Sequence, residues 1–82
     1  MEAKNKRKTQ DELYNALKRY KEKGVFSITP LINMRNMLAR RKSIDPDASQ
    51  ILWTCHVAID AWESEEKSQF DRCCDILLKK LE

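Results

Sequence analysis

Glycine and proline are scarce in this chain, which has one glycine and two prolines among its 82 residues. Loops that cradle phosphate groups need several glycines close together, so the sequence excludes a nucleotide-binding loop of that kind. No apolar stretch approaches the roughly 20 residues that cross a bilayer, and the N-terminus lacks the apolar core of a signal peptide. We therefore expect a cytoplasmic protein that does not insert into a membrane.

Catalytic and metal-binding patterns are also missing. The sequence contains one histidine, His56, and three cysteines, Cys55, Cys73 and Cys74. Structural zinc sites usually present cysteine pairs separated by two residues, whereas adjacent helical residues such as Cys73 and Cys74 point about 100° apart. The same divergence separates Cys55 from His56 and argues against a nucleophilic pair. We expect reduced thiols, no enzymatic activity, no metal ion and no cofactor.

Apolar residues recur every three to four positions, which predicts helices, and nothing alternates with the period of two typical of strands. The first helix is expected over residues 10–23. Thr9 and Glu12 form a capping box at its start, and Gly24 suits the left-handed position after its end. The connector that follows is expected to place Phe26 in the core.

Two later helices begin with a capping residue followed by proline at the first helical position. Thr29 and Pro30 start the second helix, which is expected to extend to about residue 42, because its last bases suit the negative end of the helix dipole. Asp45 and Pro46 start the third helix in the same way.

The start of the last helical segment allows two interpretations. Ser64 is an acceptable N-cap and predicts a break near residue 63. However, the apolar stripe stays in phase from Leu52 to Leu81, and no glycine or proline interrupts residues 47–82. One long helix over those residues is the alternative, and its exposed stripe would need a second chain to cover it.

These patterns predict an all-α fold. The expected architecture is a small antiparallel bundle of four helices, or of three helices with a long C-terminal one. Residues 1–8 carry four bases and no apolar stripe, so we expect a flexible basic arm there. Residues 9–82 are expected to form a single helical domain.

Charge is divided between the two halves of the chain. Residues 1–44 contain twelve bases and four acids, a net charge of +8, and residues 45–82 contain four bases and nine acids, a net charge of −5. Such asymmetry has three interpretations. The halves attract each other within one domain, the basic half meets phosphates or an acidic protein surface, or the halves of different molecules pair.

The function that we predict is that of a small regulatory or adaptor protein acting by stoichiometric protein–protein binding. Trp62 continues the main apolar stripe of the third helix, so we expect Trp53 to be the exposed tryptophan, a residue type enriched at binding hot spots. The predicted partner-binding residues are Trp53, Met34, Arg35, Arg40, Arg41 and Lys42. In size and composition the chain resembles the small accessory regulators made by phages and plasmids.

Two other functions are consistent with the sequence. Binding to the phosphate backbone of nucleic acid would use polar residues of the basic half. These residues are Lys4, Lys6, Arg7, Lys8, Asn33, Arg35, Asn36, Arg40, Arg41 and Lys42. Obligate self-association would instead pair two copies of the C-terminal helix through Phe70, Leu77 and Leu81.

Overall fold

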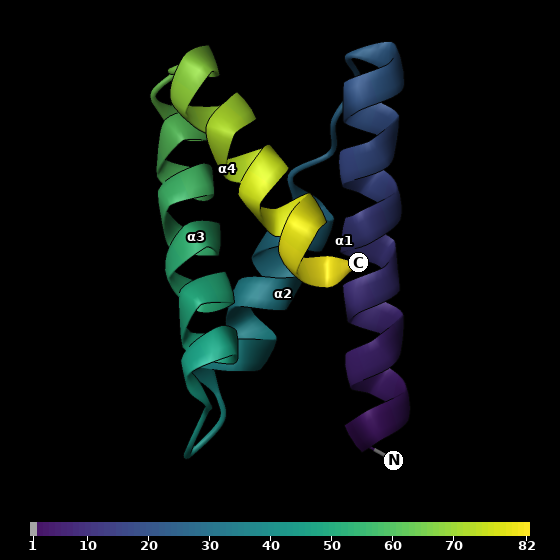
Figure 1. Ribbon diagram of the computed structural model, residues 1–82, viewed down its shortest axis with the longest axis vertical. Coiled ribbons are helices and arrows are strands. Elements are labelled where there is room, and N and C mark those ends of the chain that lie inside the picture. The colour runs from purple at the N-terminus through teal and green to yellow at the C-terminus, as the bar shows by residue number, and fades with distance from the viewer. Residues whose placement is uncertain (1) are drawn as a thin grey trace.

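Four helices account for most of the chain. The computed structural model describes the backbone of residues 2–82 and the side chains of residues 8–82. The helices are α1 (Glu2–Lys23), α2 (Thr29–Ala39), α3 (Pro46–Glu63) and α4 (Lys67–Leu81), and no strand occurs in the described part. They run alternately in opposite directions (Figure 1), which confirms the predicted four-helix antiparallel bundle. Within the described residues, α1 and α3 each pack against both α2 and α4 but not against each other.

The boundaries of α1 differ from the prediction at one end. The helix begins at Glu2 and runs without interruption through residue 9, so the capping box predicted at Thr9 and Glu12 is wrong. Its end is as predicted, because Gly24 has φ = 74° and its N–H donates to the Tyr20 carbonyl at 2.8 Å. The division into an arm over residues 1–8 and a domain over residues 9–82 stays a prediction.

Both ends of α2 also differ from the prediction. Ile28 occupies the N-cap position without a side-chain hydrogen bond, and Thr29 is already helical, so the predicted threonine cap is wrong. The helix ends at Ala39, which leaves Arg40 and the two bases after it in the turn that leads to α3. The start of α3 is confirmed, since the Asp45 Oδ1 accepts a hydrogen bond from the backbone N–H three residues later at 2.7 Å.

The turn between α3 and α4 is a Schellman motif, in which two backbone hydrogen bonds close the end of a helix. The Glu66 N–H donates to the Ala61 carbonyl at 2.9 Å, and the Glu65 N–H donates to the Trp62 carbonyl at 3.3 Å. Glu65 has φ = 58°, the left-handed conformation that glycine adopts most easily. The single long helix is therefore wrong, and Ser64 ends α3 rather than capping α4.

The core lies where the four helices face one another. Every helix contributes to it, and the buried apolar residues are Leu13, Leu17, Leu31, Met34, Leu38, Cys55, Ala58, Ile59, Ala61, Phe70, Cys73, Cys74, Leu77 and Leu81. The three residues predicted to drive self-association, Phe70, Leu77 and Leu81, all belong to this core. The fold-back of α4 covers them within one chain, so they offer no free stripe to a second copy. No helix of the described part is long and apolar enough to span a membrane.

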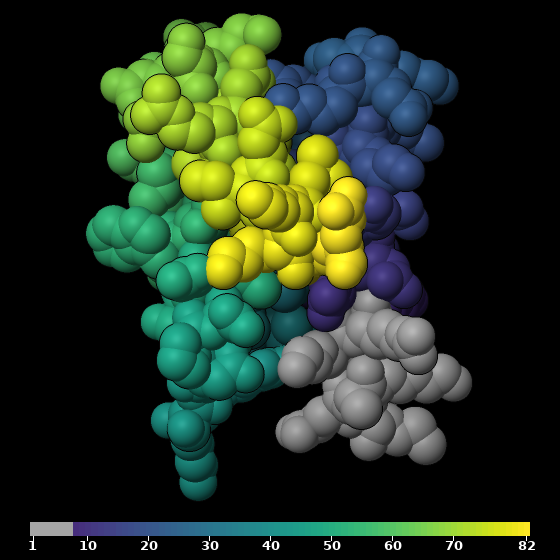
Figure 2. All heavy atoms as spheres, in the orientation of Figure 1, coloured from purple at the N-terminus to yellow at the C-terminus, as the bar shows by residue number. Residues whose placement is uncertain are grey.

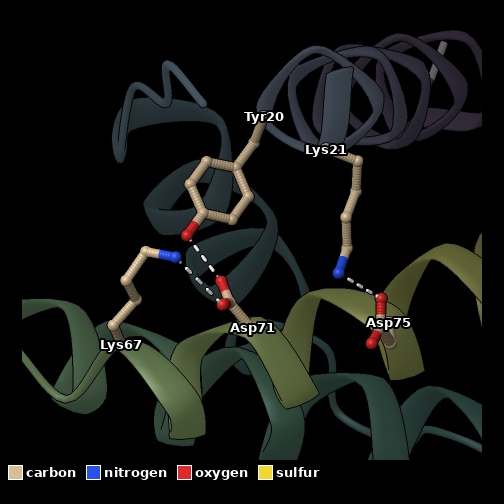
Figure 3. Close-up of polar contacts among 5 residues, drawn as sticks. All are labelled: Tyr20, Lys21, Lys67, Asp71 and Asp75. Carbon is tan, nitrogen blue, oxygen red and sulfur yellow. Dashed lines mark hydrogen bonds and ion pairs between the residues drawn. The ribbon is translucent and has the colours of Figure 1, made fainter. Parts of the chain in front are cut away.

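Polar contacts between α1 and α4 join the basic half of the chain to the acidic half (Figure 3). The Tyr20 hydroxyl donates to Asp71 Oδ1 at 2.5 Å, and the Lys21 ammonium lies 2.5 Å from Asp75 Oδ1. The hydrogen bond to the Asp71 carboxylate is the main cause that raises the pKa of Tyr20 to about 12. The same bond lowers the pKa of Asp71. Part of the charge asymmetry is thus satisfied within the domain.

Candidate functional site

Trp53 is the most exposed large apolar side chain of the described residues. Its side chain on α3 is 69% exposed, and Ile76 on α4 is 41% exposed. Both line a shallow depression of about 370 Å³ between the two helices, called here the Trp53 groove. The complete lining is Ser49, Gln50, Trp53, Thr54, Ile76 and Lys80. The predicted exposure of Trp53 is therefore confirmed.

The outward position of Trp53 follows from the helical periodicity of α3. Thr54 and Cys55 are buried against the bundle, and a helix rotates by about 100° per residue, so the residue before them faces outward. The Thr54 hydroxyl donates to the Gln50 carbonyl at 2.7 Å, so the donor of this lining residue is already used within α3. Covering the exposed part of a tryptophan yields about 3 kcal/mol of hydrophobic free energy.

One ion pair links the helices beside the Trp53 groove. The Lys80 ammonium on α4 lies 3.7 Å from Asp47 Oδ1 on α3. The Asp47 side chain is largely exposed, so solvent screens the pair and it contributes little to stability. The groove consequently has an apolar centre and a charged margin, the arrangement found in many protein interfaces.

The predicted basic residues of the described part come from two segments of the chain. Arg40, Arg41 and Lys42 follow the end of α2, and Lys8 lies exposed on the N-terminal part of α1. Figure 1 places the start of α1 and the turn after α2 at the same end, and in Figure 2 that turn forms the lower tip of the described surface. The side chains of Lys4, Lys6 and Arg7 lie outside the described residues.

Several predicted contact residues of α2 are less available. Met34 is 2% exposed and belongs to the core, so its assignment to a partner-binding surface is corrected. The Arg35 guanidinium donates to Asn36 Oδ1 from Nε at 3.2 Å and from Nη2 at 3.1 Å, and both side chains are half-buried. Asn33 is exposed. The polar residues of α2 itself therefore add little to a contact surface beyond the bases that follow the helix.

The cysteines are packed as apolar residues. Cys55, Cys73 and Cys74 are all reduced and buried. Burial raises the pKa of Cys55 and of Cys74 to about 12, so these thiols stay protonated near neutral pH. The adjacent His56 is exposed, and it points about 100° away from Cys55 around α3. The described residues include no group of three or more His, Cys, Asp or Glu side chains placed to hold a metal ion.

A second depression, which sequence reasoning missed, opens at the end of the bundle where α1 and α3 finish. It has a volume of about 440 Å³ and is called here the aromatic pocket. Its lining residues are Tyr20, Gly24, Ala61, Trp62, Glu65, Glu66, Lys67 and Phe70. These come from the end of α1 and the residue after it, from α3, from the turn between α3 and α4, and from α4, so no local pattern in the sequence could have indicated them.

Comparison with protein-family models, with curated proteins and with solved structures finds no significant match to this chain.

Proposed function

We propose that this protein is a small non-enzymatic regulator or adaptor that binds a partner protein stoichiometrically through the Trp53 groove. The observation that carries the proposal is the 69% exposed Trp53 beside the 41% exposed Ile76. An indole left open to water costs free energy that a partner recovers, and tryptophan is among the residues most enriched at interface hot spots. The regulatory role in the cytoplasm rests on the size and composition of the chain.

The test compares three immobilised baits made from the full chain. We expect wild type and Val25→Ala to retain the same partner protein from the native cell, and Trp53→Ala to lose it. Val25 is a matched control because it is also an exposed apolar residue, at 64%, but lies in the connector after α1. Hot-spot truncation typically costs 2 kcal/mol or more, which is roughly a 30-fold loss of affinity.

The opposite pattern would contradict the proposal. If Trp53→Ala keeps the partner while the double variant Arg40→Ala/Arg41→Ala loses it, the contact surface is formed by the basic residues that follow α2. Circular dichroism of each variant verifies that the helical bundle is intact. Because Trp53 is largely exposed, we expect its truncation to leave stability nearly unchanged.

A second candidate function is binding to the phosphate backbone of nucleic acid through the basic residues in the turn after α2. It is supported by the run of three bases, Arg40, Arg41 and Lys42, in the turn that forms the lower tip of the described surface (Figure 2). The affinity for labelled duplex DNA, measured by fluorescence anisotropy, should then fall steeply with salt. Arg40→Ala/Arg41→Ala should reduce the slope of log affinity against log salt by about 2. A flat salt dependence would exclude this function.

A further inference from the structure

We propose that the aromatic pocket binds the guanidinium group of an arginine side chain on a partner polypeptide. The pocket has no lining residue in common with the Trp53 groove, so this inference does not depend on the function proposed above. Its argument rests on the aromatic wall, on the charges at its rim and on the helix ends that surround it.

The wall of the pocket is a cluster of packed aromatic rings. The Trp62 indole is 38% exposed, and its ring centroid lies 5.0 Å from that of Phe70 and 5.5 Å from that of Phe26. The Tyr20 ring packs edge-on against Phe70 at 5.3 Å. Trp62 thus packs against Phe26 and Phe70 while part of its ring remains open to solvent. Aromatic faces attract cations, and guanidinium groups are the side-chain cations most often found over them.

The rim of the pocket is acidic. Glu65 and Glu66 line it, are exposed, and take part in no ion pair within the described part of the chain. The one cationic lining residue, Lys67, has its ammonium 3.4 Å from Asp71 Oδ2 (Figure 3), which offsets its repulsion of a second cation. These four side chains carry three negative charges and one positive charge, a net charge of −2.

The helix ends around the pocket also favour a positively charged ligand. α1 and α3 both finish beside it and direct the partly negative ends of their dipoles towards it, whereas α4 begins there with a partly positive end (Figure 1). Each end is equivalent to roughly half an elementary charge, so the sum is roughly minus one half. Arginine fits better than lysine because its planar group can stack on an indole and donate to two carboxylate oxygens together.

The first test is a titration followed by nuclear magnetic resonance. The probe is the acetylated and amidated tripeptide Gly-Arg-Gly, added to the full-length, isotope-labelled protein. We expect the Trp62 indole N–H signal to shift with a dissociation constant in the millimolar range. The Trp53 indole signal, assigned with a Trp53→Phe variant, should stay in place and serves as an internal control.

A peptide with citrulline in place of arginine has nearly the same shape but no charge. We expect it to bind about tenfold more weakly, since it loses the attraction to both the ring and the carboxylates. Equal binding of the two peptides would overturn the assignment to a cation. A Trp62 signal that shifts with protein concentration alone would overturn the assignment to a different polypeptide, because a second copy would then occupy the pocket.

Two double variants with equal changes of net charge separate the pocket from general electrostatic attraction. Glu65→Gln/Glu66→Gln removes the rim carboxylates and should weaken arginine binding by about tenfold. Asp60→Asn/Glu63→Gln removes two exposed carboxylates of α3 that do not line the pocket, and it should change the affinity for arginine less than twofold, because exposed charges without direct contact contribute little. Equal losses in both variants would overturn the proposal. Circular dichroism establishes that both variants fold.

Discussion

Replacement of Glu65 by glycine tests the turn that makes this fold. Glu65 holds φ = 58° in the Schellman motif, and a residue with a Cβ pays roughly 1–2 kcal/mol to adopt this conformation. Glycine avoids that cost but loses about 0.5–1 kcal/mol through the greater freedom of its unfolded state. We therefore expect Glu65→Gly to raise the free energy of unfolding by about 0.5–1 kcal/mol.

The sign of this change distinguishes the observed turn from the continuous helix that the apolar stripe permits. In the middle of a helix, glycine is about 1 kcal/mol less favourable than alanine. At a left-handed position the order is reversed, because alanine keeps the steric cost that glycine removes. The comparison of Glu65→Gly with Glu65→Ala isolates this backbone effect, since both variants lose the same carboxylate.

Urea unfolding followed by far-ultraviolet circular dichroism measures the effect. We expect the unfolding midpoint to rise in Glu65→Gly relative to Glu65→Ala, with the slope of the transition unchanged because the surface exposed on unfolding is the same. In a thermal scan the gain corresponds to about 4 °C for a domain of this size. A Glu65→Gly protein less stable than Glu65→Ala would refute the turn and favour one long C-terminal helix.

Three further predictions concern the α1–α4 contact, a helix cap and the buried thiols. Asp71→Asn should lower the pKa of Tyr20 from about 12 towards 10, as measured by the absorbance of its phenolate, because the bond to the carboxylate is the main cause of the rise. The stability that this pKa shift supplies is complete below pH 10 and is lost as the pH rises towards 12, so alkaline unfolding in that window should shift in the variant. Asp45→Ala removes the cap of α3 and should lower the free energy of unfolding by about 1 kcal/mol, whereas Asp45→Asn, which keeps an acceptor, should change it far less. The buried thiols of Cys55 and Cys74 should react with a disulfide reagent only as fast as the protein unfolds, and rapid labelling in native buffer would contradict the burial that raises their pKa.

The helices could be predicted from the sequence, but several of their ends could not. Asp45 and Pro46 fix the start of α3 by local chemistry alone, since the cap and the proline are both next to the first turn. The end of α2 was predicted from the preference of bases for a helix C-terminus, which is worth less than 1 kcal/mol at an exposed site. Such a preference cannot decide between Ala39 and residue 42 when the chain has to turn back towards α3.

The candidate sites also differ in how well the sequence could predict them. The exposure of Trp53 could be predicted because it depends only on the phase of α3 relative to its buried face. Met34 was misplaced because its neighbour Met37 lies about 60° from it around the helix, so that periodicity alone could not separate the buried methionine from the half-buried one. The aromatic pocket depends on the packing of α1 against α4, and only that contact brings Tyr20 beside Phe70.

The left-handed residue at the α3–α4 turn determines which apolar surface the protein has left for a partner. With a continuous helix, Phe70 and the leucines after it would remain on an open stripe, and a second copy would be their natural cover. The turn instead directs α4 back along α3 and α1, and these side chains enter the core. Trp53 and Ile76 lie on the outer sides of the same two helices, so the fold-back that buries the stripe also creates the Trp53 groove. A partner that docks there would therefore recognise the folded four-helix bundle and not a single exposed helix.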